Sequence, residues 1–188
     1  TVDIAVNAAQ DAAGNDRVAA SQFETNYDST VPTIAITSNI SGSVTNSTFT
    51  ATFTFNEDVT GFIASDVTAI NATVGSVTAS SASVYTATVT PTNDGSVTLD
   101  VAANSAQDSA GNGNTAATQF ATTYDASLST VVITSDIIGD STNSTFTATF
   151  TFNEDVTGFI ASDVTAINAT VGSVTASSAS VYTCRYRP

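Results

Sequence analysis

Residues 47–62 read STFTATFTFNEDVTGF, and this stretch decides the fold. Its first nine residues alternate apolar side chains with threonines, which is typical of a β-strand with one buried face. The apolar face consists of Phe49, Ala51, Phe53 and Phe55. The polar and acidic NED that follows indicates the end of the strand and the start of a loop.

The same stretch shows that the chain is built from repeats. FNEDVTGF begins at 55 and again at 152, an offset of 97 residues (152 − 55), and residues 45–86 are identical to 142–183. A period of this length fits an autonomous domain. We therefore expect three parts: the end of one repeat (1–28), a complete repeat (29–125) and the first part of a third (126–188). In the last part, CRYRP at 184–188 stands where the complete repeat has ATVTP, and we interpret it as an anomalous tail.

Alternating apolar patterns predict seven short strands in the complete repeat, with no convincing helix. Their expected ranges are 33–37, 48–55, 66–71, 73–79, 84–90, 96–102 and 118–124. Turn signals rich in glycine, asparagine and aspartate separate them. The prediction is an all-β fold, an antiparallel β-sandwich in which each sheet has one apolar face.

The composition of the chain makes several classes of function unexpected. The net charge is −14 and the only bases are Arg17, Arg185 and Arg187, so binding to nucleic acid or anionic lipid is not expected. Without His or Lys there is little material for general-base or Schiff-base chemistry, and we predict no enzyme activity. No apolar run is long enough to insert into a membrane. Cys184 is the sole cysteine, which excludes an intrachain disulfide.

Four motifs in order give the chain a family resemblance. FNEDVTGF is followed by ASDV (64–67), VYTATVTPTNDGSVTLDVAA (84–103) and AQDSAGNGN (106–114). They resemble the bacterial Ig-like repeats of large secreted surface proteins and adhesins, many of which marine and other Gram-negative bacteria export by type I secretion. The resemblance implies tandem immunoglobulin-like sandwiches and an extracellular or cell-surface location, with export signals outside this stretch.

Acidic residues from distant parts of the sequence should gather where the chain enters each sandwich. Antiparallel topology brings the loops 56–66 and 103–117 to this end, beside the incoming linker. Carboxylates without a nearby base repel one another unless a cation binds, and Ca²⁺ prefers oxygen ligands. The alternative is that these are solvated loop acids. The candidate ligands between domains are Asp28, Glu57, Asp58, Asp66 and Asp108, and in the third repeat Asp125, Glu154 and Asp155.

The leading interpretation is that the chain serves as a stalk or spacer in cell adhesion or biofilm formation, with stiffening by Ca²⁺ as a further hypothesis. Its expected partners are the neighbouring Ig-like repeats and an unknown surface ligand. The alternatives are a repeat that itself binds a glycan or protein, and a self-associating component of a surface layer or matrix. Residues 1–28 and 126–183 each carry only part of a repeat. We therefore expect head-to-tail strand complementation between copies at high concentration.

Overall fold

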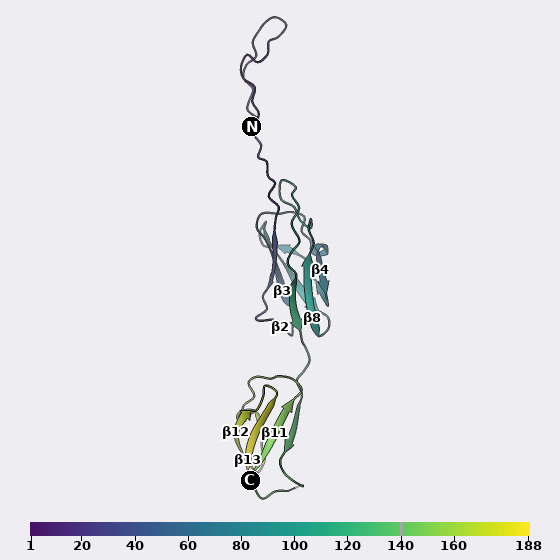
Figure 1. Cartoon of the computed structure of the whole chain (residues 1–188), viewed down its shortest axis with the longest axis vertical. Coiled ribbons are helices and arrows are strands. Elements are labelled where there is room, and N and C mark those ends of the chain that lie inside the picture. Colours follow the sequence, from purple (N-terminus) through teal and green to yellow (C-terminus); the bar gives the residue numbers. More distant parts are fainter. Residues whose placement is uncertain (140) are drawn as a thin grey trace. The chain divides into compact units, whose positions relative to one another are not determined.

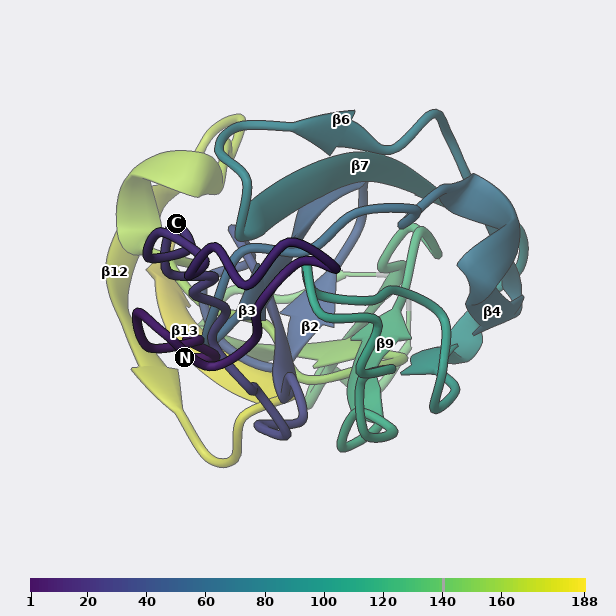
Figure 2. The same cartoon turned by 90° about the horizontal axis from the view of Figure 1, so that it is seen from above.

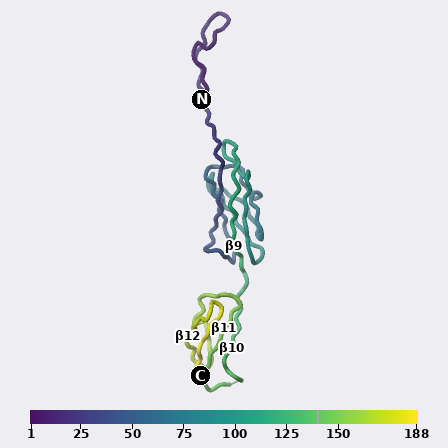
Figure 3. The backbone as a smooth tube through the Cα atoms, in the orientation of Figure 1, coloured from purple at the N-terminus to yellow at the C-terminus, as the bar shows by residue number. Residues whose placement is uncertain are grey.

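The computed structural model describes residues 1–139 and 141–188 and divides the chain into two compact units. The first unit is Thr1–Ala126 and the second is Ser127–Pro188 (Figures 1 and 3). The regular elements of the described residues are β-strands, apart from two single 3-10 turns. None of the described helical turns is long and apolar enough to cross a membrane.

The complete repeat contributes two sheets, and both grow from the alternating segments of the sequence. The first sheet has the order β1-β3-β7-β5, with β6 paired to β7 (Figure 2), and all of its pairs are antiparallel. Its strands are β1 (Ile34–Ser38), β3 (Phe49–Phe55), β5 (Ala72–Val74), β6 (Thr78–Ala79) and β7 (Val84–Pro91).

The second sheet has the order β2-β9-β8-β4. Its strands are β2 (Val44–Thr45), β4 (Val67–Ile70), β8 (Gly95–Val101) and β9 (Phe120–Tyr124). Strand β8 pairs antiparallel with both neighbours, placing Leu99 opposite Ala69 on one side and Phe120 on the other. The short strand β2 runs parallel to β9.

The core lies between these sheets and is filled by the predicted inward faces. Phe53, Ala51, Val89, Val97 and Leu99 are fully buried. Four aromatic rings close the end of the core near the loop that follows β3, meeting edge to face with centroids 5.2–5.9 Å apart. These rings belong to Phe53, Phe55, Phe62 and Tyr85. The prediction of an immunoglobulin-like antiparallel sandwich is confirmed.

Two details differ from the prediction. The strand expected at 73–79 is interrupted between β5 and β6, where the amide of Gly75 still bonds the Thr88 carbonyl at 2.8 Å. A Cβ atom at Gly75 would lie 3.3 Å from that carbonyl oxygen, so the close approach favours glycine. Strand β2 was not predicted, because two residues carry no periodic signal.

The second unit contains one sheet with the order β10-β11-β13-β12. Its elements are β10 (Val131–Ser135), β11 (Phe146–Phe152), the 3-10 turn η2 (Ala161–Asp163), β12 (Thr170–Ala176) and β13 (Val181–Arg187). Residues 184–187 of the CRYRP tail belong to strand β13 and alternate between buried and exposed. Cys184 and Tyr186 are buried, and the ring of Tyr186 stacks on Phe146 at 5.1 Å.

Residues 1–28 form an open hairpin without a named strand. Two isolated antiparallel bridges hold it, one between Val2 and Phe23 and one between Gln10 and Asp16. Its apolar side chains are exposed, with Val2 at 65% and Phe23 at 62%. The division of the chain at residue 28 stays a prediction.

Candidate metal centre

Hydrogen bonds bring two loops and the incoming linker together at one end of the complete repeat. The loop after β3 meets the loop between β8 and β9 through a reciprocal pair, Thr60 N to Gln107 O at 2.8 Å and the reverse bond at 3.1 Å. The linker joins them where Thr115 N donates to Pro32 O at 2.8 Å. This is the end at which the sequence placed the acids.

Three of the predicted ligands converge there. One carboxylate oxygen each of Asp28, Glu57 and Asp108 lies within 4.8 Å of the other two. Asp28 is exposed, Glu57 is half-buried and Asp108 is buried. The donors come from the linker, the loop after β3 and the β8–β9 loop, so only the folded repeat with its linker assembles them.

Glu57 occupies the least favourable electrostatic position in this group. Its Oε1 is buried and accepts no hydrogen bond from any residue that the structure describes. Burial raises the pKa of this carboxyl group, and the neighbouring carboxylates of Asp108 and Asp28 raise it further. A buried, unpartnered carboxylate oxygen facing two other acids fits a bound cation. In the second unit Oε1 of Glu154, the equivalent residue, is likewise buried without a partner among the described residues.

Asp108 is held ready by a tight local turn. Its Oδ1 accepts the amides of Ala110 and Asn112 at 2.9 and 2.8 Å, and its Oδ2 accepts Nδ2 of Asn112 at 2.8 Å. The Asn112 side-chain bond is the main cause that lowers the pKa of Asp108, so the carboxylate stays ionised. Asn112 Nδ2 also donates to the carbonyl of Asp28 at 3.2 Å, which ties the linker to this loop.

The other predicted ligands lie in different surroundings. Asp58 is exposed and is not one of the three grouped acids. Asp66 caps the 3-10 turn η1 (Ala64–Asp66), where its Oδ2 accepts the Ile63 amide at 2.8 Å. Asp125 belongs to the first unit, whereas Glu154 and Asp155 belong to the second. That set of ligands stays a prediction.

Two side chains that support this end of the repeat were missed from the sequence. The hydroxyl group of Tyr85 donates to the Val59 carbonyl at 2.8 Å and so anchors the acidic loop to strand β7. Asn114 is fully buried, and its Oδ1 accepts the Ala106 amide at 2.7 Å. Its Nδ2 donates to the carbonyls of Ala102 and Thr115. Asn114 lies in a segment that only signals a turn, so its burial was not readable.

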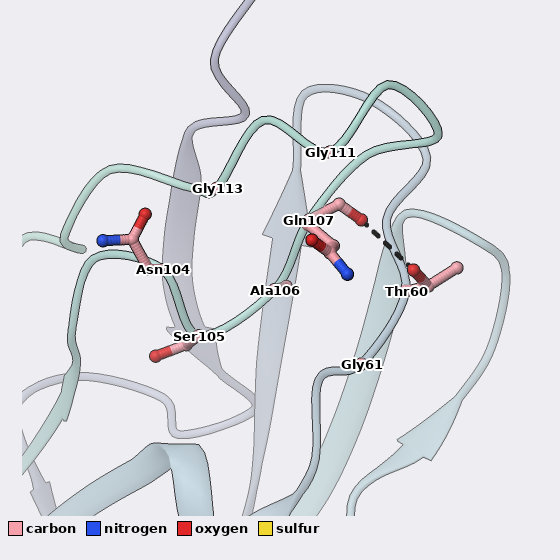
Figure 4. Close-up of a pocket in the computed structure, with 8 residues that line it drawn as sticks. All are labelled: Thr60, Gly61, Asn104, Ser105, Ala106, Gln107, Gly111 and Gly113. Atoms are coloured by element: carbon pink, nitrogen blue, oxygen red, sulfur yellow. Dashed lines mark hydrogen bonds between the residues drawn. The ribbon is translucent and has the colours of Figure 1, made fainter.

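A shallow polar pocket of about 270 Å³ lies between the loop after β3 and the β8–β9 loop (Figure 4). The hydrogen-bonded segments at Thr60 and Gln107 form one wall, and Asn104 and Ser105 lie at the other side. The eight lining residues include no aromatic and no charged side chain. The pocket therefore offers neither a stacking platform for a sugar nor an acid–base pair.

The fold and this end of the repeat define an immunoglobulin-like β-sandwich module with an acid-lined entry. The family model described as bacterial Ig-like domain matches residues 28–124 and 125–188, and the chain belongs to this family. Among solved structures, the Escherichia coli adhesin FdeC is similar at 15% sequence identity with a TM-score of 0.45. The similarity covers 82% of this chain and 54% of that one, so the chain spans about half of its length. No curated protein sequence matches the chain.

Proposed function

We propose that the chain is a non-catalytic spacer module of a bacterial cell-surface or secreted protein, which helps to project an adhesive part away from the cell. The observation that carries this proposal is the position of the chain ends in the complete repeat. The chain enters the repeat at Pro32, which bonds Thr115 in the loop before β9. It leaves after Tyr124, which pairs with Thr45 at the opposite end of β9. Modules entered and left at opposite ends extend a chain when they follow one another. Each would add about 40 Å, given strands of about seven residues and their loops.

Near-identity of the repeats supports a role that depends on length. Residues 45–86 recur unchanged at 142–183, solvent-facing positions included. A spacer needs the same stable unit several times, whereas a ligand site is needed once. Cell adhesion and biofilm formation are the settings that this role suits, and the surface ligand would lie in another part of such a protein.

A Ca²⁺ ion bound by Asp28, Glu57 and Asp108 would stiffen the entry of the repeat. All three donors are hard carboxylate oxygens, the kind that Ca²⁺ prefers, and the ion would compensate the charge beside the unpartnered Glu57 oxygen. Because Asp28 belongs to the linker and the other two to the sandwich, binding would fix the linker to the module.

Thermal unfolding with and without Ca²⁺ tests the metal site. At calcium concentrations well above the dissociation constant of an extracellular site, we expect the melting temperature of the first unit to rise by about 5 °C or more relative to EDTA. Mg²⁺ at equal concentration serves as the control for screening, since it demands a tighter octahedral site. An unchanged midpoint in Ca²⁺ would remove the stiffening part of the proposal.

The spacer role itself is tested by binding assays. The 188-residue chain should bind neither a glycan array nor cultured cells above background, since its pocket has no aromatic platform. Saturable binding to one glycan or one cell type would favour the alternative in which the repeat is itself the adhesive.

A further inference from the structure

The side-chain amide of Asn112 joins the β8–β9 loop to the linker that enters the repeat. Its Nδ2 donates to Oδ2 of Asp108 at 2.8 Å and to the main-chain carbonyl of Asp28 at 3.2 Å. Asn112 is also the only asparagine in the sequence that a glycine follows. A reaction that removed this one nitrogen would break both bonds at once.

The amide nitrogen of Gly113 lies next to this side chain and is not engaged. Gly113 forms an isolated antiparallel bridge with Gln107, and the bonds of this bridge belong to the residues on either side of Gly113. Asn112 O accepts an amide at 3.1 Å, and Asn114 N donates to a carbonyl at 3.0 Å. The amide of Gly113 itself makes no hydrogen bond within residues 1–139 and 141–188.

The glycine leaves this nitrogen open to the Asn112 side chain and to water. Without a Cβ atom, residue 113 has no side chain that would hinder a close approach. A Cβ atom placed there would overlap Oδ1 of Asn104, so the packing around Asn104 favours glycine. Gly111 and Gly113 line the polar pocket between the two loops, which gives water access to the Asn-Gly pair (Figure 4).

These groups and water are the complete set of reactants for deamidation. The Gly113 nitrogen attacks Cγ of the adjacent Asn112, and the new N–Cγ bond closes a cyclic imide. The Cγ–Nδ2 bond breaks, and Nδ2 leaves as ammonia with the proton that the Gly113 amide loses. Water then opens the imide, and no oxidant or reductant takes part. Opening at the side-chain carbonyl gives aspartate, whereas opening at the main-chain carbonyl gives isoaspartate.

We propose that Asn112 is a site of spontaneous deamidation, which releases the linker from the β8–β9 loop as the protein ages. The product carries a carboxylate oxygen where Nδ2 donated to Asp108, so two acids face each other. An ionised carboxylate has no proton to donate to the carbonyl of Asp28. The isoaspartate product also lengthens the main chain beside the bridge to Gln107.

The folded structure makes this reaction slow and gives it a direction. Both hydrogen bonds of Asn112 restrain its side chain, so the reaction should await brief opening of the loop. Once ammonia has left, the original amide does not form again, and the bond to the linker is lost for the life of the molecule. The reaction needs no metal ion and is therefore independent of the Ca²⁺ site.

Peptide mapping of the aged 188-residue chain tests the reaction. The chain is kept in mildly alkaline buffer with EDTA, because base removes the amide proton of Gly113 and EDTA removes any Ca²⁺. Mass spectrometry then compares Asn112 with Asn15. Asn15 makes the same main-chain and side-chain bonds to the aspartate four residues before it, but Asp16 follows it instead of glycine.

We expect aspartate and isoaspartate to appear at position 112. They should form about tenfold faster or more than at Asn15, which corresponds to about 1.4 kcal/mol in activation free energy. Equal rates at the two asparagines, or an unchanged Asn112, would overturn the proposal. This comparison uses the parent chain alone, so it does not depend on the folding of any variant.

Asn112→Asp supplies the aspartate product directly and tests the release of the linker. Two amides report on the linker: Thr33 N donates to Asn56 Oδ1 at 2.6 Å, and Thr115 N donates to Pro32 O at 2.8 Å. Hydrogen exchange measured by NMR should be faster at both amides by about fivefold or more, since the bonds of Asn112 are lost.

Gln107→Glu is the charge-matched control for this variant. Gln107 is exposed in the same loop, and its side-chain amide makes no hydrogen bond with any residue that the structure describes. The change adds the same charge without removing a bond to the linker, so exchange at Thr33 and Thr115 should be nearly unchanged. Equal acceleration by both variants, or none by Asn112→Asp, would show that Asn112 does not hold the linker and would overturn the proposal.

Discussion

At the residue scale, the hydroxyl group of Tyr85 links the aromatic core to the acidic loop. The ring of Tyr85 contacts Phe55 and Phe62 edge to face, and the hydroxyl group is the only polar part of this side chain. Its bond to the Val59 carbonyl holds the residue that follows Glu57 and Asp58. Tyr182 makes the same bond to Val156 at 2.9 Å in the second unit, so the arrangement is local to this sequence.

Tyr85→Phe should destabilise the first unit by about 1–2 kcal/mol, because the buried Val59 carbonyl loses its partner while the ring still fills the core. Urea denaturation followed by circular dichroism measures the change. Tyr27→Phe is the matched control, since Tyr27 is 92% exposed, and it should have no effect. Equal stability of Tyr85→Phe and the parent chain would show that the bond contributes nothing.

Glu57→Gln should have opposite effects with and without Ca²⁺. The raised pKa means that the folded state holds the proton of Glu57 more tightly than the unfolded state does. The stability from this group is therefore greatest below the ordinary value of 4.5 and is lost as pH rises through the raised pKa. Without Ca²⁺ at pH 7, Glu57→Gln should melt higher than the parent chain, and the difference should disappear below pH 4.5.

In Ca²⁺ the same variant should lose the gain in melting temperature, because one ligand is missing. Asp58→Asn is the control: it removes one charge next door, at an exposed position outside the grouped acids. If both variants change the calcium response alike, net charge rather than the site would explain the response.

At the scale of elements, strand formation in this chain depends on partners. Sequence alternation correctly predicts β3, β7 and β8, and each of these strands is buried on one face and has a pairing partner on both sides. It is insufficient for 164–167, which copies β4 without forming a strand. Local preference thus sets which residues can be extended, and pairing decides which are strands.

Amide exchange measured by NMR should separate the two copies of this segment. In dilute solution the amides of β4 that bond β8 should be protected, whereas those of residues 164–167 should exchange quickly. Their different environments give separate resonances in spite of the identical sequence. Equal protection in a monomer would mean that the segment forms its strand without a partner.

How much of the fold and of the site could be predicted depends on whether a feature is set by local sequence or by contacts between distant segments. Strands with strong alternation were predicted within about one or two residues, and so were their buried faces. Strand β2 exists only through its contact with β9, which no local pattern reports. For the site, topology indicated which loops meet, but side-chain direction was not readable. Asp66 lies in one of those loops and instead caps a turn.

At the scale of the whole molecule, the two units should unfold separately. The first has two sheets around its core, whereas the second has one sheet and exposes several large apolar side chains. Less apolar area is removed from water per residue in the second unit, so its stability should be lower. A dilute sample should show two calorimetric transitions.

Leu99→Ala should lower only the upper transition. Leu99 is fully buried in the first unit, and its truncation should cost about 2–5 kcal/mol through lost burial and a cavity. Val2→Ala changes the corresponding hairpin residue, which is exposed, and should move neither transition in dilute solution. A single transition in the parent chain, shifted by Leu99→Ala as a whole, would show that the two units unfold together.

The opposite positions of entry and exit also decide how the complete repeat responds to tension. Force on the linker pulls β1 along its own axis past β3, and force on the exit pulls β9 past β8. Both terminal strands are therefore loaded in shear, and the five register pairs that join each of them to its neighbour share the load at once instead of opening one after another. Rupture then requires a high barrier to be crossed in one event, so the rate of forced unfolding is slow. A series of such modules would resist brief pulls rather than lengthen under them.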